Sequence, residues 1–202
     1  QAIKVLKRKN LKGLNVTIPY KEKIIPYLDT ISKEAKDIMA VNTISFNNQG
    51  KLIGHNTDCY GFQKSLLKNI NKKTKNALIL GTGGASKAIR HVLKKNSIKY
   101  KTVSRKRNKG DFIYIELDRD IMSNFELIVN TTPLGTYPNT EKCPDINFDH
   151  VTQNHVLFDL IYNPIKTRFL KNGEIKGAKI VNGYDMLIYQ AEKSWSIWNK
   201  IN

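Results

Sequence analysis

The sequence predicts an α/β protein in which a doubly wound parallel sheet is accompanied by a smaller α/β unit. An apolar run at 77–80 leads into a glycine cluster at 81–84 and then into a helical apolar repeat. Strands and helical segments alternate from there almost to the end of the chain, as they do around parallel sheets. A hairpin pattern precedes residue 58, and 202 residues suffice for two small domains.

The first part of the chain is expected to contain only short elements. In order they are the end of a helix in 1–9, a strand at 13–18, helical pieces at 22–28 and 33–39, and hairpin strands at 41–46 and 52–54. Pro19 stops the first strand because it has no N–H for the ladder. The polar, glycine-ending segment 47–50 forms the hairpin turn.

From residue 58 onward the apolar spacing is helical or marks buried strands. A helix begins at Asp58, with Cys59, Phe62, Leu66, Leu67 and Ile70 on its apolar face. Strands are expected at 77–80, 98–103, 112–115, 127–130, 156–160 and 179–181. A last helix starts near 183–185 and carries Leu187, Gln190, Ala191, Ser194, Trp195 and Trp198 on one face. Because Gln190 is polar within that stripe, we expect its side chain to face a pocket.

The glycine cluster is the clearest local sign of function. The helix after it presents Ala85, Ala88, Ile89, Val92 and Leu93 on one face. A strand, a tight glycine turn and a helix N-terminus aim backbone N–H groups and a positive dipole end at one point, which suits a pyrophosphate. Ser86 stands where the third Gly or Ala of G-x-G-x-x-G/A belongs. A plain glycine turn in an α/β core therefore remains the alternative.

The end of the next strand distinguishes between the two dinucleotides. An NAD site places an acidic residue about 20 residues after the glycines, where it binds the ribose 2′-OH. Residues 103–109 read VSRKRNK here and contain no acid. Cations suit a 2′-phosphate, and the Arg105 guanidinium can bind one through two hydrogen bonds. The sequence favours NADP(H) over NAD, and a solvated basic loop is the competing interpretation.

A formal net charge of +17 is the most prominent feature of the composition. Such a charge would suit nucleic acid or another polyanion. The lysines are spread along the whole chain, however, and no basic segment is interleaved with aromatic residues. Lys, Asn and Ile are abundant together, as codon choice in an A+T-rich genome would produce. We expect salt-sensitive adhesion and no specific nucleic-acid partner.

The spacing of cysteine, histidine and apolar residues argues against a metalloprotein, a membrane protein and a secreted protein. Cys59 and Cys143 have no redox or metal spacing and the four histidines form no ligand pattern, so no metal site is expected. No run of 18 apolar residues would span a membrane, and the first residues lack a signal-peptide core. These features predict a cytoplasmic protein with reduced thiols and no membrane partner.

Six further phrases occur in the order in which they occur in shikimate dehydrogenases. They are GLNVTIPYK at 13–21, AVNTI at 40–44, GHNTDCYGF at 54–62, VNTTPLG at 129–135, DLIYNPIKT at 159–167 and GYDMLIYQA at 183–191. They resemble that family's G-x-N-V-T-x-P-x-K, A-V-N-T, G-x-N-T-D-x-x-G, N-A-T-x-x-G, D-x-x-Y-x-P-x-x-T and G-x-x-M-L-x-x-Q-A motifs. Because six phrases in family order cover nearly the whole chain, the resemblance is specific.

The resemblance implies reversible reduction of 3-dehydroshikimate to shikimate with hydride from NADPH, a step toward the aromatic amino acids. Lys21 and Asp58 match the catalytic pair. The substrate-contacting positions are Thr17, Lys21, Asn42, Asp58, Tyr162 and Gln190. The cofactor positions are Gly81, Gly83, Gly84, Ala85, Ser104, Arg105, Lys109, Thr131 and Gly183. It also implies a Rossmann-like NADP-binding domain at 58–183 and a substrate domain at 1–57, completed by the C-terminal helix at 184–202.

Elementary chemistry agrees with the catalytic pair. Reduction of a ketone builds negative charge on oxygen, and a nearby ammonium stabilises that charge and hands over a proton. Each residue nevertheless has a structural alternative. Lys21 would be a surface lysine at a helix start and Asp58 a helix N-cap. Thr17 and Asn42 would satisfy backbone groups at strand ends, and Tyr162 would belong to the core.

The chain departs from the family pattern in three places. Nothing resembles the H-S-x-S-P motif whose serines hold the substrate carboxylate, so we expect the chain to lack the first strand or strands of the substrate domain. That loss would leave an unpaired sheet edge and poor turnover. Ser104 replaces the Asn usual before the basic residue, and the helix expected between Lys109 and Phe112 is missing. Both changes predict a looser adenosine end of the cofactor site.

Two alternatives remain, one of the same functional class and one of a different class. One is a quinate/shikimate dehydrogenase that uses NAD, and the other is a non-catalytic NADP-binding homologue. In each case the partner is a small molecule, and the protein is expected to be a monomer or a homodimer.

Overall fold

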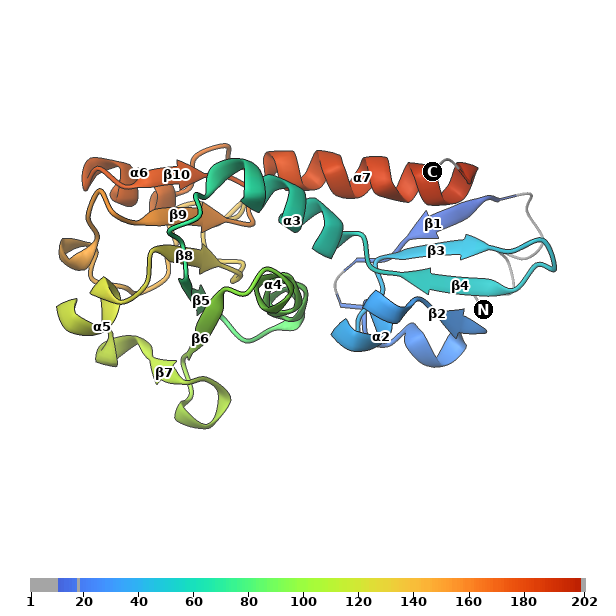
Figure 1. The fold of residues 1–202 in the computed structure, drawn as a ribbon, viewed down its shortest axis with the longest axis horizontal. Coiled ribbons are helices and arrows are strands. Elements are labelled where there is room, and N and C mark those ends of the chain that lie inside the picture. The colour runs from blue at the N-terminus through green and yellow to red at the C-terminus, as the bar shows by residue number, and fades with distance from the viewer. Residues whose placement is uncertain (1–10, 18, 201–202) are drawn as a thin grey trace.

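The computed structural model describes residues 11–17 and 19–200 and contains two β-sheets (Figure 1). A four-stranded sheet lies in the first part of the chain and a six-stranded sheet in the rest. All neighbouring strands of the larger sheet are parallel. The α/β class and the parallel sheet predicted from the sequence are confirmed. The helix end predicted in 1–9 lies outside the described residues.

The smaller sheet has the strand order β1-β3-β4-β2. Its strands are β1 (Gly13–Asn15), β2 (Thr30–Ile31), β3 (Thr43–Phe46) and β4 (Leu52–His55). β3 is antiparallel to β1 and β4, whereas β2 runs parallel to β4. Helix α2 (Lys33–Ile38) covers one face, where Val41, Ile44 and Leu52 are buried in a small core. The alternate residues of β3 and β4 face the opposite side.

Two predictions for this part need correction, and one strand was not predicted. The strand predicted at 13–18 ends at Asn15. The helical piece predicted at 22–28 is only a 3₁₀ turn at Ile25–Tyr27, where Pro26 has no N–H to contribute to an α-helical ladder. β2 was not predicted, since two residues carry no periodicity; it is stabilised by its pairing with β4.

The larger sheet has the strand order β10-β9-β8-β5-β6-β7. Its strands are β5 (Asn76–Leu80), β6 (Lys99–Ser104), β7 (Phe112–Ile113), β8 (Leu127–Asn130), β9 (Val156–Asp159) and β10 (Lys179–Val181). The helices of this part are α3 (Asp58–Asn69), α4 (Gly84–Lys95), α5 (Arg119–Ser123), α6 (Arg168–Ile175) and α7 (Tyr184–Asn199). Short 3₁₀ turns lie at Arg107–Lys109, Tyr114–Glu116 and Phe148–His150.

Helices cover both faces of the larger sheet, as expected for a doubly wound fold. Ile79 packs with Phe62 of α3 and Ile89 of α4 on one face. Leu78 packs with Phe169 of α6 on the other. Successive residues of β5 thus enter different cores, which explains why its sequence is continuously apolar rather than alternating.

Several residues differ from their predicted places. The strand predicted at 112–115 ends at Ile113, because the Glu116 carboxylate accepts a hydrogen bond from the Ile113 N–H at 2.8 Å and closes a turn. Other residues predicted on apolar helix faces are exposed at the surface: Leu67, Ala85, Ala191 and Trp195.

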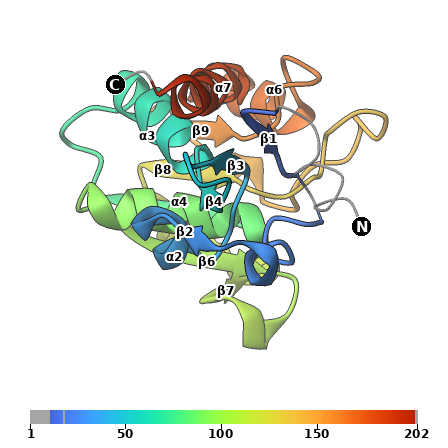
Figure 2. The same ribbon diagram turned by 90° about the vertical axis from the view of Figure 1, so that its right-hand side faces the viewer.

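Helices α3 and α7 lie side by side in both views, and α7 runs from the larger sheet to the smaller one (Figures 1 and 2). At its far end the Trp198 indole N–H donates to the Ile44 carbonyl at 2.9 Å. The two helices cross at Gly61, where a Cβ would lie 2.5 Å from the Met186 carbonyl oxygen. Only glycine permits this approach, so Gly61 fixes how α7 passes from one sheet to the other.

Candidate active site

A cavity of about 420 Å³ opens where the two sheets meet. Predicted site residues that line it are Thr17, Lys21, Asn42, Asp58, Ala85, Tyr162, Gly183 and Gln190. The other lining residues are Asn15, Val16, Leu160, Met186 and Leu187. The fold therefore brings residues of distant motifs into one space, and Gln190 faces a pocket as predicted.

Lys21 and Asp58 form an ion pair in this cavity, with the Lys21 Nζ 2.7 Å from the Asp58 Oδ2. Their side chains are 25% and 18% exposed, so both reach the cavity while being partly shielded from bulk water. Lys21 is thus not an ordinary surface lysine. A cation and a carboxylate held together can donate a proton and accept a hydrogen bond at adjacent points.

Backbone contacts hold each partner of this pair. The Lys21 carbonyl accepts a hydrogen bond from the Val41 N–H at 2.8 Å, which ties its loop to the segment before β3. Asp58 is the first residue of α3, where a negative charge interacts favourably with the helix dipole. Thr57 flanks the helix, and the Asp58 carboxylate bonds to side chains instead of helix amides. The interpretation of Asp58 as a simple N-cap is therefore wrong.

Asn42 orients the Asp58 carboxylate. It is only 3% exposed, and its amide nitrogen donates to Asp58 Oδ1 at 3.0 Å and to the Thr57 hydroxyl at 3.0 Å. Its side-chain oxygen, Oδ1, accepts from the Thr57 N–H at 2.7 Å. The same amide nitrogen lies 3.4 Å from the Gln190 Oε1. Asn42 thereby occupies one oxygen of Asp58 and leaves the other to Lys21.

A polar cluster behind Asn42 was missed by the sequence analysis. The Ser194 hydroxyl of α7 lies 2.8 Å from the Thr43 hydroxyl and 3.0 Å from the Thr57 hydroxyl. The Asn15 amide reaches the Thr43 hydroxyl at 3.3 Å. These residues join α7 to the smaller sheet beneath the cavity. The signal that could have found Ser194 is the one used for Gln190, a polar side chain within an apolar helix stripe.

The opposite wall comes from the end of β9 and the start of α7. Tyr162 is 48% exposed, so its interpretation as a core residue is wrong. The Gly183 N–H donates to the Ile161 carbonyl at 3.0 Å. A Cβ on Gly183 would lie 2.1 Å from the Leu160 carbonyl oxygen, so only glycine lets α7 begin against this loop.

The glycine turn lies between β5 and the first turn of α4. Gly81 has φ +104°, and a Cβ there would meet the Thr131 hydroxyl oxygen at 2.9 Å. Gly83, Gly84 and Ala85 are exposed at the start of α4. Ser86 is fully buried, and its hydroxyl donates to the Gly83 carbonyl at 2.7 Å. Serine therefore replaces the expected small residue because its hydroxyl is satisfied within the turn.

The predicted 2′-phosphate residues lie beside this turn and do not line the cavity. Ser104 ends β6, and its hydroxyl accepts from the Lys106 N–H at 3.2 Å. Arg105 and Lys109 are exposed on the following loop. In the described part of the chain neither takes part in an ion pair. The Gly81 N–H donates to the Val103 carbonyl at 2.9 Å, which places the basic loop next to the glycine turn.

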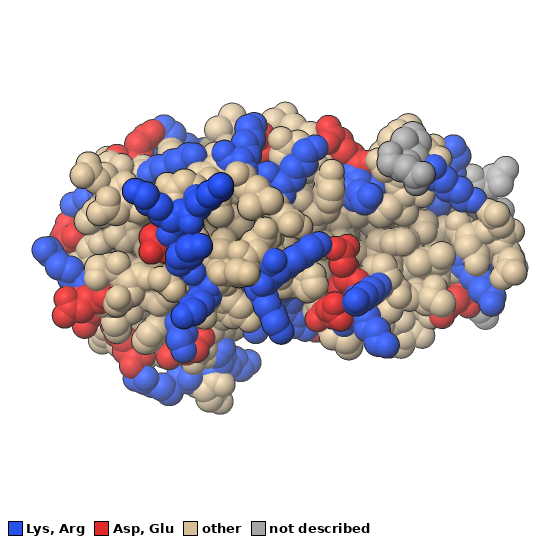
Figure 3. Space-filling model, in the orientation of Figure 1, with Lys and Arg blue, Asp and Glu red and all other residues tan. Residues whose placement is uncertain are grey.

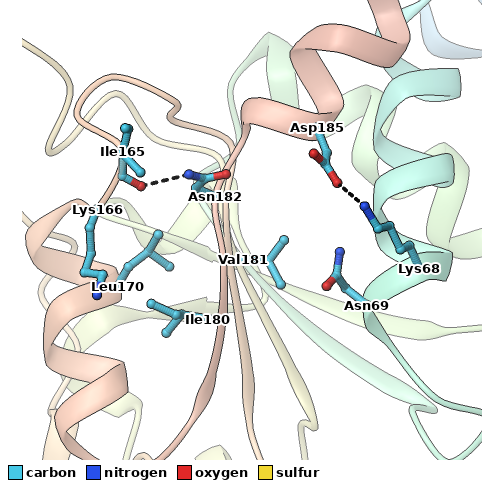
Figure 4. A pocket seen from close by; sticks show the side chains of 9 residues that line it. All are labelled: Lys68, Asn69, Ile165, Lys166, Leu170, Ile180, Val181, Asn182 and Asp185. Atoms are coloured by element: carbon cyan, nitrogen blue, oxygen red, sulfur yellow. Dashed lines mark hydrogen bonds and ion pairs between the residues drawn. The ribbon is translucent and has the colours of Figure 1, made fainter.

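Two other surface features have a structural explanation. A hollow of about 310 Å³ beside β10 is lined by none of the predicted site residues (Figure 4). Its polar side chains already have partners, because Lys68 pairs with Asp185 and Asn182 donates to the Ile165 carbonyl.

The basic side chains on the face in Figure 3 are spread from end to end with acidic ones among them. The visible charge forms no single polyanion-binding patch.

The thiols and the remaining ionisable groups give no sign of metal chemistry in the described residues. Burial raises the pKa of Cys59 to about 12 and that of Cys143 to about 11, so both stay protonated near neutral pH. No group of three or more His, Cys, Asp or Glu residues is placed to hold a metal within residues 11–17 and 19–200. Across those same residues, no helix is sufficiently long and apolar to span a membrane.

Comparison with known proteins identifies similar sequences and structures. The family model described as the shikimate dehydrogenase substrate binding domain matches residues 1–44 of the sequence. An NADP(+) shikimate dehydrogenase of Carboxydothermus hydrogenoformans is 41% identical over 100% of this chain and 77% of its own length. A chorismate mutase/shikimate 5-dehydrogenase fusion protein from Clostridium acetobutylicum is 39% identical, with a TM-score of 0.87 over 100% of this chain and 75% of that one. The Thermus thermophilus shikimate 5-dehydrogenase, solved with NADP(H) and shikimate, is 28% identical with a TM-score of 0.87, over 98% and 77% of the two chains.

Proposed function

The chain belongs to the shikimate dehydrogenase family, and on that premise we propose that it catalyses the reversible, NADP-dependent reduction of 3-dehydroshikimate to shikimate. The observation that carries this proposal is the Lys21–Asp58 ion pair of 2.7 Å in a cavity that also reaches Ala85, in the first turn of α4. Acid–base groups and a dinucleotide turn thus border the same space. The substrate is a small molecule, and the reaction leads toward the aromatic amino acids.

The glycine turn fits an NADP(H) pyrophosphate. Among residues 11–17 and 19–200, apart from the chain neighbours, no atom lies within 4 Å of a Cβ built on Gly83, and a Cβ on Gly84 would have only the Glu22 carboxylate near it, at 3.4 Å. The first amides of α4 are therefore accessible to an anion. Gly81, Gly83, Gly84, Ala85 and Thr131 would hold the pyrophosphate side, with Gly183 nearer the substrate. Ser104, Arg105 and Lys109 would border the 2′-phosphate, and Arg105 offers the bidentate contact.

When bound, NADPH supplies the hydride that reduces the ketone. The Lys21 ammonium would stabilise the negative charge that develops on the substrate oxygen and donate a proton to it. In the reverse direction the same nitrogen accepts the hydroxyl proton. The Asp58 carboxylate holds Lys21 in place and accepts a hydrogen bond from a substrate hydroxyl.

Neutral polar groups around the pair suit a substrate with several hydroxyls. Thr17, Asn42, Tyr162 and Gln190 line the cavity on different sides. Hydroxyl and amide groups of this kind reject an analogue that lacks a hydroxyl, because the analogue leaves a partner unpaired. We assign Thr17, Lys21, Asn42, Asp58, Tyr162 and Gln190 to substrate recognition.

The proposed domain division follows the two sheets. Residues 1–57 with 184–202 would form the substrate domain, and residues 58–183 the Rossmann-like NADP-binding domain. α3 begins the second domain and packs along α7 of the first, so this helix pair would join the two domains. We propose a monomer or homodimer with no nucleic-acid or membrane partner, located in the cytoplasm.

The test is shikimate-dependent reduction of NADP⁺ by the complete encoded protein, followed at the absorbance of NADPH. Lys21→Ala should lower kcat by about 10²–10⁴-fold. Lys23→Ala is the matched control, since this exposed neighbour does not line the cavity, and it should change kcat less than about twofold. Near-normal turnover by Lys21→Ala would exclude the mechanism.

The same assay separates the alternatives. Faster turnover with quinate and NAD⁺ would show that the protein is a quinate/shikimate enzyme and that Arg105 does not select NADP. Thermal stabilisation by NADP⁺ without any shikimate-dependent turnover would indicate a non-catalytic cofactor-binding protein.

A further inference from the structure

A buried carboxylate outside the cavity connects both of its walls. Asp159 is the last residue of β9, is 0% exposed and does not line the cavity. Its Oδ1 accepts from the Asn130 amide at 3.1 Å and from the Ile161 N–H at 3.1 Å. Its Oδ2 accepts from the Thr167 hydroxyl at 2.6 Å. All three partners donate, so the site requires an acceptor on both oxygens.

The charge of Asp159 has no cationic partner among the ion pairs of the described residues. Burial raises its pKa to about 6, and the bonds from Thr167, Ile161 and Asn130 act in the opposite direction. Burial, with a smaller contribution from the Asp159 charge, raises the pKa of the Cys143 thiol to about 11, so this thiol stays neutral. An uncompensated buried charge is costly, so these three hydrogen bonds are what stabilise the Asp159 carboxylate in the fold.

One branch of these bonds leads to the substrate wall. Asp159 holds the Ile161 N–H, and the Gly183 N–H holds the Ile161 carbonyl at 3.0 Å. Ile161 is therefore fixed on both of its backbone polar groups. The next residue is Tyr162, whose side chain lines the cavity. The position of Tyr162 thus depends on Asp159.

A second branch leads to the glycine turn. Because its nitrogen donates to Asp159, the Asn130 amide oxygen faces the next turn and accepts from the Thr132 N–H at 3.0 Å and the Thr132 hydroxyl at 2.7 Å. The Thr131 hydroxyl then donates to the Leu80 carbonyl at 2.8 Å. Thr131 and Thr132 are the residues that a Cβ on Gly81 would strike. Asp159 therefore also sets the turn that packs against the dinucleotide turn.

The third branch has only a structural consequence. Thr167 flanks the start of α6, where its oxygen accepts from the Leu170 N–H while its hydroxyl donates to Asp159. This contact stabilises the helix and reaches neither wall of the cavity.

From these contacts we propose that Asp159 is a positioning residue for the reaction: it fixes Tyr162 and the 131–134 turn relative to one another, and with them the substrate and the cofactor. The inference rests on the proposed function, because it assigns Asp159 a role in that reaction. Asp159→Asn keeps the shape but puts an amide N–H₂ where an acceptor is needed. Asp159→Asn should lower kcat/KM for shikimate by about 10–100-fold, the effect of a small misplacement of reacting groups, with the Kd for NADP⁺ changed less than about threefold.

Thr167→Val is the matched control. It removes one bond to Asp159 and the helix contact without touching Ile161 or Asn130, so it should lower Tm while kcat/KM changes less than about threefold. If kcat/KM falls in both Asp159→Asn and Thr167→Val, each time in proportion to the loss of Tm, the proposal is overturned. So would Asp159→Asn with kcat/KM within twofold of the parent. If Asp159→Asn does not fold, Asn130→Ala decides: it should lower kcat with the KM for shikimate little changed, and an unchanged kcat/KM would refute the second branch and the proposal.

Hydrogen exchange separates this proposal from the proposed function. Asp159→Asn should speed amide exchange in segments 131–134 and 161–163, and Thr167→Val should not. If the parent protein shows no shikimate-dependent turnover but the exchange changes as expected, the proposed function fails while the positioning of both loops stands. An active parent with unchanged exchange and kinetics in Asp159→Asn would refute the positioning role alone.

Discussion

The crossing of α3 and α7 at Gly61 offers a sharp test of how packing controls the site. In Gly61→Ala the new Cβ would lie 2.5 Å from the Met186 carbonyl oxygen and 3.0 Å from the Gln190 backbone nitrogen. The first distance is about 0.9 Å short of an ordinary contact of 3.4 Å. The clash is with backbone atoms, so a side-chain rotation cannot relieve it. The two helices must move apart.

Two opposing terms set the size of the effect. Alanine is a better helix former than glycine by about 1 kcal/mol, whereas overpacking of a close contact costs about 1–3 kcal/mol. Because the contact atoms belong to helix backbone, we expect the upper part of that range. Gly61→Ala should therefore lower the free energy of unfolding by about 1–2 kcal/mol, and urea denaturation measures it.

The same displacement should reach the substrate. Met186 and Gln190 both line the cavity and both lie at the crossing. The KM for shikimate should rise several-fold, while the Kd for NADP⁺ changes little because the glycine turn lies on other elements. A Gly61→Ala protein that is more stable than the parent by the helix-propensity term, with an unchanged KM, would refute this account of the crossing.

Three further predictions concern single side chains. Ser65 on α3 has a buried hydroxyl with no hydrogen-bond partner among the residues that the structure describes, so Ser65→Ala should raise the free energy of unfolding by about 1 kcal/mol. The same urea titration measures this change, and a loss of stability would contradict the prediction. Glu22 pairs with Lys87 at 2.7 Å beside the first turn of α4. Glu22→Gln should tighten NADP⁺ binding by about fivefold at low salt, because it removes about 1 kcal/mol of repulsion between the carboxylate and the cofactor phosphates. In binding titrations this gain should disappear at roughly 0.5 M salt, and weaker binding by the variant at low salt would contradict the prediction. Burial raises the pKa of Asp159 from its ordinary value of 3.8 to about 6 in the fold, so between these values the native state retains a proton that the unfolded chain loses. The contribution of Asp159 to the free energy of unfolding should therefore fall by up to about 3 kcal/mol as pH rises from about 4 to about 6. The difference in stability between the parent and Asp159→Asn should show this slope, and a difference that is independent of pH would refute the prediction.

The sequence predicted the larger sheet well because its strands are continuous apolar runs. The strands at 127–130 and 179–181 have the predicted bounds, and β5 begins one residue earlier than expected. Burial on both faces leaves little ambiguity in such segments. β2 and the strand end at Ile113 depend on side-chain-to-backbone bonds and pairing with distant residues. Periodicity carries no information about either.

The site was predictable to the extent that its residues stand in motifs. Lys21, Asn42 and Gln190 line the cavity, and they could be selected from the sequence because each stands in a recognisable motif. Their roles in the reaction are a proposal. Ser194 and Asp159 were not selected, since their importance lies in which donors surround them. The sequence contains their chemistry, but only the fold reveals that Ser194 lies against Thr43 and that Asp159 receives three hydrogen bonds.

The contacts between the two sheets differ in strength, and this difference indicates where motion would occur. The Glu22–Lys87 and Glu34–Lys95 pairs join the first part of the chain to α4. Their side chains are 30–51% exposed, and exposed pairs contribute at most about 1 kcal/mol each. The α3–α7 crossing is instead close-packed backbone against backbone. The ion pairs can therefore open and close at little cost while the helix crossing persists, so the cavity would widen on the α4 side and keep Gln190 and Asp58 together.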